Sequence, residues 1–100
     1  MYTVIANFNF KTESDRDWFL EFLRSPEGLC KTRVYKGCIS IDVYSDQFKK
    51  NKSIVLWEKW FSREDHLEYL DYRKNTGLLD EVISKLDGKL DLQSLDHIQC

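Results

Sequence analysis

The sequence predicts an α+β fold in which helices cover one face of a four-stranded antiparallel sheet, and three observations support it. Two stretches alternate apolar and polar residues with the period of a strand, and a third is rich in β-branched and aromatic residues. The segments between them repeat apolar residues with the period of a helix. With 100 residues, of which 42% are hydrophobic, the chain is expected to form one domain, 1–100, with a real core.

Residues 2–10 are expected to form the first strand, because their apolar residues fall on one face. The opposite face mixes Ile5 with two amides, Asn7 and Asn9. A buried amide costs free energy unless it finds hydrogen-bond partners. Asn7 therefore either lies on an exposed face or serves as a polar group in a cavity, and both alternatives stay open.

A helix is expected next, capped by Thr12 or Ser14, whose hydroxyl oxygens can accept hydrogen bonds from its first turn. Pro26 is expected to open a second short helical piece, since proline is favoured at a first helical position. Gly37 marks the turn into the next strand. The apolar stripe of the first helix has helical spacing, which is typical of core residues: Trp18, Phe19, Phe22 and Leu23.

Residues 38–45 alternate as the second strand, and the polar residues 46–52 connect it to the third. A short polar connection between adjacent strands indicates an antiparallel hairpin. One face of the second strand is expected to carry Ile39, Ile41 and Val43, and the other Cys38, Ser40, Asp42 and Tyr44.

The stretch Asn51 to Gly77 contains the third strand, a corner and a capped helix. Residues 53–61 form the strand, and Trp57 is expected on the sheet face opposite the helices. Ser62 stands at the N-cap position with Asp65 three residues later, as in a capping box. Gly77 ends this helix. One helical face is expected to carry His66, Leu67, Leu70 and Arg73, with Tyr69 at its edge.

Residues 78–86 indicate a further short helix, and residues 90–98 a weaker strand. The resulting order, β-α-β-β-α-(α)-β, predicts a ferredoxin-like sandwich. The uncovered sheet face then needs a partner, and the simplest partner is the same face of a second copy. We therefore expect a homodimer with Trp57 in its interface.

Composition excludes several classes of function. The net charge is −2 and basic residues are scattered among acidic ones, so no nucleic-acid partner is expected. No apolar stretch has the roughly 18 to 20 residues that span a bilayer, and no signal peptide is visible, so no membrane partner is expected. The three cysteines lack CxxC spacing, which disfavours a disulfide framework or zinc site and favours the reducing cytoplasm.

The strand end at Trp60 and the helix that follows bring usable side chains into one neighbourhood. His66 is the candidate general base because its unperturbed pKa lies near the working range, although a half-exposed helix histidine is the alternative. Trp60 is either a core residue, which is favoured, or a stacking wall for a ring. Tyr69 and Tyr72 either offer hydroxyls to an oxyanion or cover the core edge.

Two charged residues complete this candidate site. Arg73 either binds a substrate carboxylate or phenolate or pairs with an acidic neighbour, for which Glu58 is the obvious candidate. Glu58 lies within an apolar strand, so it must be paired or exposed at the rim. Asn7, Trp60, His66, Tyr69 and Arg73 are together expected to line one cavity between the sheet and the second long helix.

Three motifs resemble one family. The pattern Thr32-Arg33-x-x-x-Gly37-Cys38, followed by ISIDVY, resembles the second strand of antibiotic biosynthesis monooxygenase (ABM) domains and the residues before it. The pattern Leu56-x-Glu58-x-Trp60-x-Ser62-x-Glu64 resembles their third strand and helix entry. HLEYLDYRKNTGLLDEV is similar to the helix pair that follows, so the resemblance runs from Thr32 to Leu86.

The resemblance implies a dimeric α/β barrel with a pocket between each sheet and its own helices. Characterised members oxidise phenols, quinols and related aromatics with dioxygen and need neither metal nor flavin, which implies no cofactor here. A related branch degrades haem and has an Asn at the position of Asn7. In that branch a Trp stands at the position of Tyr69 and the haem-ligating His at Leu79, so haem is disfavoured. Many members of the ABM family have His where Tyr69 stands.

Two functions therefore remain open. The first is a homodimeric, cofactor-independent monooxygenase that acts on a small aromatic or quinol-like substrate with dioxygen. Its expected catalytic residues are His66, Tyr69 and Asn7, and its expected substrate-binding residues are Glu58, Trp60, Tyr72 and Arg73. The alternative is a non-catalytic dimer of the same fold that binds a small molecule or serves as an accessory subunit, because fold alone does not decide function.

Overall fold

The computed structural model describes residues 1–49 and 51–100, and it contains the elements in the predicted order. Lys50, in the predicted polar connection, lies outside the described residues. The elements are β1 (Tyr2–Asn9), α1 (Glu13–Arg24), α2 (Leu29–Val34), β2 (Cys38–Tyr44), β3 (Ser53–Trp60), α3 (Arg63–Asn75), α4 (Leu78–Ser84) and β4 (Asp91–Asp96).

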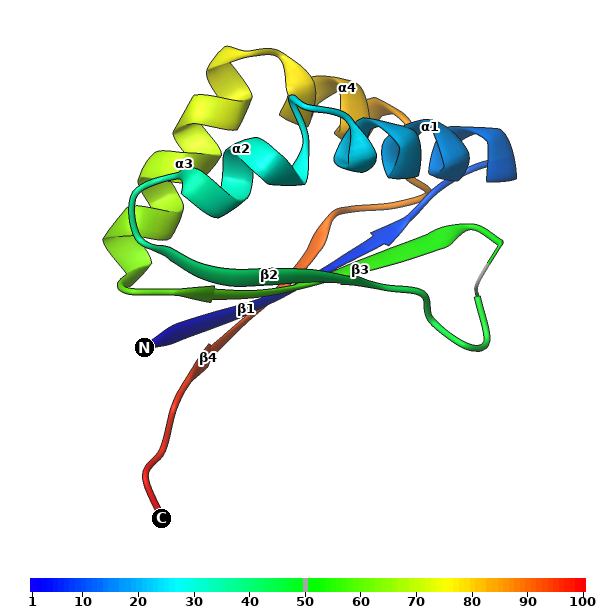
Figure 1. Ribbon diagram of the computed structural model, residues 1–100. Helices are drawn as coiled ribbons and strands as arrows, with labels where there is room; N and C mark the ends of the chain where they lie inside the picture. Colours follow the sequence, from blue (N-terminus) through cyan, green and yellow to red (C-terminus); the bar gives the residue numbers. More distant parts are fainter. Residues whose placement is uncertain (50) are drawn as a thin grey trace.

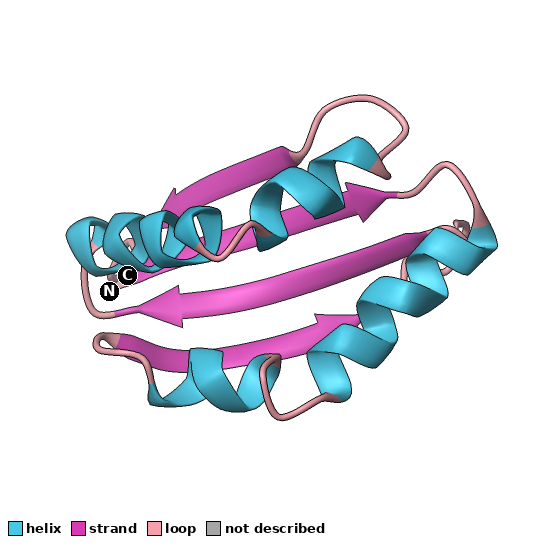
Figure 2. Ribbon diagram, turned by 90° about the horizontal axis from the view of Figure 1, so that it is seen from above, coloured by secondary structure: helices cyan, strands magenta, loops and turns pink. Residues whose placement is uncertain are grey.

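The strands form one four-stranded sheet in the order β2-β3-β1-β4, and every pairing is antiparallel. All the helices lie on the same face of this sheet (Figure 1). Seen from above, α1 and α2 form one row that runs roughly along the strands, and α3 and α4 form a second row beside it (Figure 2). This arrangement confirms the predicted ferredoxin-like α+β fold.

The apolar face of β1 packs under the helices, with Val4, Ala6 and Phe8 buried. Because successive side chains point to opposite faces, Asn7 lies on the open side of the sheet. The prediction that Asn7 lines the cavity under the second long helix is therefore wrong. The helices cover the face that gains most from burial, and the amide face is left outside.

A β-bulge shifts the pairing of β2 with β3 between Cys38 and Ser40. The predicted simple alternation along β2 is therefore wrong at its start. Ile39 is 49% exposed, whereas Cys38 packs against the core together with Ile41 and Val43. A bulge inserts one extra residue and so exchanges the faces before and after it.

The helix α3 begins where its cap predicts, because the Ser62 hydroxyl oxygen accepts a hydrogen bond of 3.1 Å from the backbone N–H of Asp65. Its buried residues are His66, Tyr69 and Arg73, which recur at i, i+3 and i+7. Leu67, predicted on the same face, is 45% exposed. The three large polar side chains, rather than the leucine, turn toward the sheet.

We expect Ser62→Ala to lower the free energy of unfolding by about 1 kcal/mol, because one N–H of the first turn of α3 loses its acceptor. A thermal melt with matched buffer measures this change. Ser62→Asp, which keeps an acceptor at the same position, is the control and should retain the wild-type melting temperature. An unchanged melt for Ser62→Ala would contradict a contribution of this cap to stability.

The core contains two clusters. The larger lies under α1 and α4 and includes Phe8, Phe10 and Phe19, whose rings contact one another. The smaller lies under α3 and consists of Val4, Trp60 and Tyr69, and in it Trp60 is fully buried. Trp60 is therefore a core residue, as the favoured interpretation predicts.

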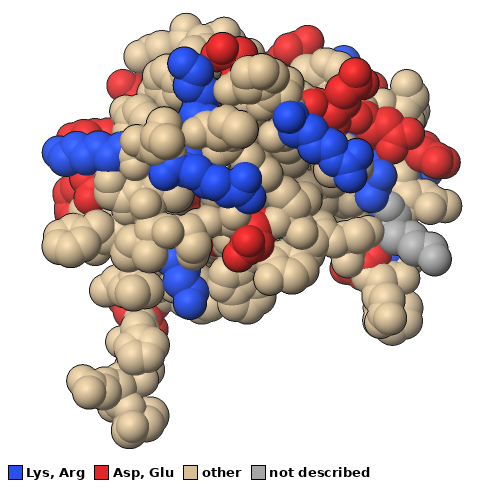
Figure 3. Space-filling view, viewed as in Figure 1, with Lys and Arg blue, Asp and Glu red and all other residues tan. Residues whose placement is uncertain are grey.

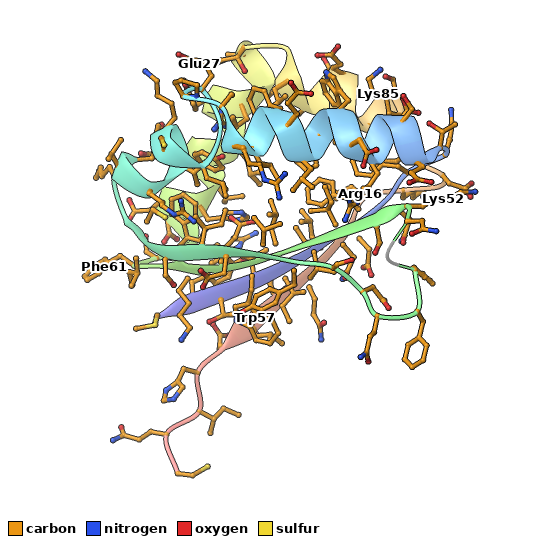
Figure 4. All side chains as sticks on the ribbon, turned by 45° about the vertical axis from the view of Figure 1, so that its right-hand side comes forward. Arg16, Glu27, Lys52, Trp57, Phe61 and Lys85 are labelled. Carbon is orange, nitrogen blue, oxygen red and sulfur yellow. The ribbon has the colours of Figure 1, made fainter. Side chains whose placement is uncertain are left out.

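The surface carries interspersed charges of both signs over the helices on the face shown in Figure 3. None of the described helices is long and apolar enough to cross a membrane. The opposite side of the sheet carries Trp57, which points away from the helices (Figure 4) and is 42% exposed. Its ring meets that of Tyr44 edge-on at 6.5 Å, so exposed aromatic surface gathers on the open face.

Candidate functional site

A small cavity lies between the sheet and the helices. Its volume is about 60 Å³, which is enough for a few water molecules or a small ligand. Its walls come from both rows of helices and from all four strands, and most are apolar. The lining residues are Ala6, Phe8, Phe19, Phe22, Leu23, Leu29, Thr32, Ile41, Leu56, Glu58, His66, Tyr69, Leu70, Arg73, Leu78, Leu79, Val82, Leu90 and Leu92.

The structure brings some of the predicted site residues to this cavity and leaves others outside. Glu58 reaches it from β3, and the α3 residues His66, Tyr69 and Arg73 all line it. Three predicted residues do not line it: Asn7 is on the open face, Trp60 lies in the smaller core cluster, and Tyr72 stacks on Tyr35 at 5.4 Å.

A wider, open cleft of about 560 Å³ lies near the connection between β2 and β3. Its lining includes polar side chains such as Gln47, Lys49 and Asn51, and it opens broadly to solvent. We favour the smaller cavity as the site, because it combines apolar walls with a few convergent polar groups, as small-molecule sites do.

Glu58 is buried in the cavity wall, and no Lys or Arg side chain among the described residues forms an ion pair with it. It is 5% exposed, and the indole N–H of Trp60 donates a hydrogen bond of 3.0 Å to its Oε1. Burial raises the pKa of Glu58 from 4.5 to about 7, and the Trp60 hydrogen bond only partly opposes this. The expectation that Glu58 pairs with Arg73 is wrong, because Arg73 donates its hydrogen bonds to Tyr69, Thr32 and two backbone carbonyl groups.

His66 stands next to this carboxyl group, with its Nε2 3.9 Å from Glu58 Oε1. It is 3% exposed, so the half-exposed alternative is wrong. The rings of Trp60 and Tyr2 lie 5.4 and 5.7 Å from its ring, and burial lowers the pKa of His66 from 6.5 to about 4. At neutral pH, His66 is therefore an uncharged imidazole and Glu58 is the group near its titration midpoint.

The Nδ1 atom of His66 is buried and has no hydrogen-bond partner among the described residues. An unpartnered buried polar atom is uncommon, and one in a cavity wall calls for an explanation. A ligand group in the cavity would supply the missing hydrogen bond. In neutral imidazole one ring nitrogen donates and the other accepts, so His66 suits either kind of ligand group.

A second polar cluster occupies another part of the cavity wall. The Tyr69 hydroxyl lies 2.7 Å from Thr32 Oγ1 and accepts a hydrogen bond of 2.8 Å from Arg73 Nε. Arg73 Nη2 also donates to Thr32 Oγ1 at 3.1 Å. Burial raises the pKa of the Tyr69 hydroxyl, so it stays protonated and holds this cluster together.

Two backbone carbonyls complete the cluster. Arg73 donates hydrogen bonds of 3.0 Å to the carbonyl oxygens of Glu27 and Gly28. Gly28 is the N-cap of α2, which begins at Leu29 rather than at Pro26 as predicted. A Cβ at Gly28 would collide with the carbonyl groups of α1, so only glycine lets the chain pass there and present these two oxygens.

Sequence reasoning missed the role of Thr32 and of these carbonyls. Thr32 is 1% exposed, and its contacts lie 37 and 41 residues further along the chain. No local periodicity signals such partners. The one available signal was that Thr32 belongs to a motif used for the family resemblance.

The described residues contain no group of three or more His, Cys, Asp or Glu side chains that could hold a metal ion. The site instead offers a carboxyl group poised to exchange a proton, a neutral imidazole and a cation. In a mostly apolar cavity these groups can bind a small ligand, remove a proton from it and stabilise the charge that results.

Comparison with known proteins agrees with this fold. No family model matches the sequence, and no curated protein is similar enough to match. Solved structures do match. A crystal structure of an antibiotic biosynthesis monooxygenase is 24% identical with a TM-score of 0.82, covering 99% of this chain and 100% of its own. Rv0793 from Mycobacterium tuberculosis is 24% identical with a TM-score of 0.74, covering 98% and 95%.

A third structure, the Streptomyces coelicolor monooxygenase from the gene ActVA-Orf6 in complex with nanaomycin D, is 13% identical. Its TM-score is 0.75, and the match covers 99% of this chain and 88% of that chain. At these identities the likeness establishes the fold and leaves the reaction open. The chain therefore has the fold of the antibiotic biosynthesis monooxygenases, as the motif resemblance implies.

Proposed function

We propose that this protein is a cofactor-independent monooxygenase of the antibiotic biosynthesis monooxygenase type, which oxidises a small aromatic or quinol-like substrate with dioxygen. The observation that carries the proposal is the buried carboxyl group of Glu58 in the wall of an apolar cavity, with its pKa raised to about 7 beside a neutral His66. The shared fold supports the same reaction type.

The proposed reaction begins with removal of a proton from the substrate. The resulting carbanion or phenolate transfers an electron pair to dioxygen, and a carbon–oxygen bond forms. When the O–O bond breaks, one oxygen atom stays as a carbonyl oxygen and the other leaves as water with two protons from the substrate. Dioxygen is the oxidant, and the substrate supplies all the electrons that reduce it, so the balance needs no cofactor.

In this proposal Glu58 replaces His66 as the base, because an effective base has a pKa near the working pH. Trp60 positions the Glu58 carboxyl group through its indole hydrogen bond. His66 offers its unpartnered Nδ1 to the substrate. Tyr69 and Tyr72 act indirectly, Tyr69 by holding Arg73 and Tyr72 by stacking beside it. Asn7 has no role, because it lies outside the cavity.

The size of the cavity limits the substrate. Its volume of about 60 Å³ is well below the roughly 300 Å³ or more of pockets for drug-sized ligands. A cavity of about 150 Å³ is needed to hold a benzene ring, so even a single-ring substrate requires this cavity to widen. Oxygen uptake tests the proposal, with a panel of single-ring hydroquinones and without added metal or flavin. Uptake no faster than in a protein-free control across the panel would refute it.

The alternative function, a non-catalytic dimer that binds a small molecule, is favoured by one observation. The Tyr69 hydroxyl and most N–H groups of Arg73 are engaged within the protein, as in a rigid binding site. The two functions differ in their response to Glu58→Gln. Loss of a base lowers turnover more than affinity, whereas a change in a binding site alters affinity alone.

We further propose that the protein works as a cytoplasmic homodimer joined through the open sheet face, which carries Trp57. Sedimentation at micromolar concentration should give twice the chain mass, and Trp57→Glu should shift the protein to monomer, because a buried charge opposes association. Leu67→Glu is a matched control at a similarly exposed apolar residue on the helical side. A well-folded wild-type monomer would refute the dimer.

A further inference from the structure

Arg73 is a buried cation in the cavity wall. It is 5% exposed, and the rings of Phe22, Tyr69 and Tyr72 surround its guanidinium group at 5.3 to 5.6 Å from Cζ. Guanidinium groups are favourably placed against aromatic faces. A buried charge nevertheless remains costly unless an opposite charge or several hydrogen bonds compensate for it.

Among the residues that the structure describes, no acidic side chain pairs with this cation. The ion pairs among the described residues join Arg16 to Asp17, Lys36 to Asp65 and Lys85 to Asp15, and none includes Arg73. The nearest candidate in the cavity wall, Glu58, bonds to Trp60 instead. Burial also raises its pKa to about 7, which keeps much of it uncharged. The cavity wall therefore carries one positive charge without a counter-ion.

The hydrogen bonds of Arg73 leave one donor over. A guanidinium group has five N–H groups. Nε bonds to Tyr69, Nη1 to the Glu27 carbonyl, and Nη2 to the Gly28 carbonyl and Thr32. These bonds occupy four N–H groups, so one Nη1–H has no partner among the described residues. Carbonyl dipoles and ring faces solvate the cation, but none of them neutralises it.

We propose that the cavity is a receptor for a small organic anion, a carboxylate or phenolate carried on no more than one ring, with Arg73 as its counter-charge. Arg73 and His66 line the same cavity, and the unpartnered His66 Nδ1 supplies a second polar anchor. Charge-assisted hydrogen bonds from arginine to carboxylates and phenolates are among the strongest in proteins, and an apolar cavity strengthens them further.

This inference rests on the proposed function for the identity of the site and adds the chemical class of its substrate. A phenolate or enolate gives up electrons to dioxygen more readily than its neutral form. A site that binds the anion would therefore also favour the species that reacts. Arg73 would stabilise the negative charge that develops when Glu58 removes a proton.

The test compares isosteric ligands that differ in charge. We expect benzoate to bind the wild-type protein at least 10-fold more tightly than benzamide in calorimetric titrations at pH 7. Acetate and acetamide form a smaller matched pair for a cavity that does not widen. Arg73→Gln should abolish the preference for the anion, whereas Arg16→Gln, which removes an arginine already paired with Asp17, should retain it.

The ligand comparison keeps the proposal falsifiable even if Arg73→Gln fails to fold, because it uses the wild-type protein. Equal affinity for both members of each pair, or no binding of any of the four ligands, would overturn the anion receptor. Oxygen uptake is measured separately. An anion preference without oxygen uptake would refute the monooxygenase proposal and support the anion receptor. Oxygen uptake without an anion preference would refute the anion receptor and support the monooxygenase.

Discussion

Glu58→Gln is expected to lower kcat by about 10²- to 10⁴-fold, which is the contribution usual for a positioned general base. Glutamine has nearly the same shape as glutamate, and its amide oxygen can still accept the hydrogen bond that the Trp60 indole now gives to Glu58. It cannot take up a proton. The substitution therefore tests the chemistry of the carboxyl group with little change in packing, and steady-state oxygen uptake measures the effect.

The pH dependence provides the second part of this test. Because the Glu58 pKa lies at about 7, turnover in the wild type should rise through neutral pH as the carboxyl group loses its proton. Glu58→Gln should lose this rise together with most of the rate. His66→Asn is the comparison variant, since it leaves Glu58 in place. If His66→Asn abolished turnover and Glu58→Gln retained it, the base would be His66.

The order of the elements and the helix starts could be predicted because local chemistry determines them. Ser62 and Thr12 each cap a helix by accepting a hydrogen bond from the residue three positions later. Such signals lie within one turn of the chain and need no knowledge of the rest of the fold. The same holds for the positions of the strands, which followed from local alternation and from runs of β-branched and aromatic residues.

The candidate site was predicted only in part, because its chemistry depends on distant contacts. The spacing of His66, Tyr69 and Arg73 placed all three on one side of α3, and the structure agrees. The hydrogen-bond partners of these side chains could not be predicted from spacing along the sequence. Arg73 bonds to groups 41 to 46 residues earlier in the sequence, rather than to Glu58.

The protonation of the site was beyond sequence reasoning for a related reason. The unperturbed pKa of histidine pointed to His66 as the base, but a pKa follows the surroundings of the folded group. Here Trp60 and the cavity walls exclude water from both Glu58 and His66, and burial moves their pKa values in opposite directions. Glu58 therefore takes the role of general base that the sequence analysis expected for His66.

The same glutamate should weaken the fold above neutral pH. Its pKa in the folded protein, about 7, lies above its ordinary value of 4.5, so the folded state holds the proton more tightly than the unfolded state does. Between these two pH values the unfolded chain has lost the proton and the folded chain has kept it. The contribution of Glu58 to stability must therefore fall as the pH rises from 4.5 to 7, and this loss persists above 7.

His66 acts with the opposite sign. Its pKa in the folded protein, about 4, lies below its ordinary value of 6.5, so the unfolded state binds the proton more tightly and stability rises between these pH values. In the wild type the two slopes overlap and largely cancel. Removing the carboxyl group should expose the rise that belongs to His66.

We therefore expect the unfolding free energy of Glu58→Gln, relative to that of the wild type, to rise by about 3 kcal/mol between pH 4 and pH 8. This size follows from the rise of the Glu58 pKa from 4.5 to about 7, because a pKa difference of one corresponds to about 1.36 kcal/mol. Urea unfolding at several pH values measures this difference. Comparing pH values cancels any constant effect of the substitution on packing. Glu68→Gln, at an exposed position on α3, is the control, and its stability curve should run parallel to that of the wild type.

Parallel stability curves for Glu58→Gln and the wild type would show that the folded protein holds Glu58 as an ordinary carboxylate, and the base proposed for the reaction would lose its physical basis. A gain above pH 7 in a variant that has lost turnover would show that the fold gives up stability to keep this carboxyl group in an apolar wall.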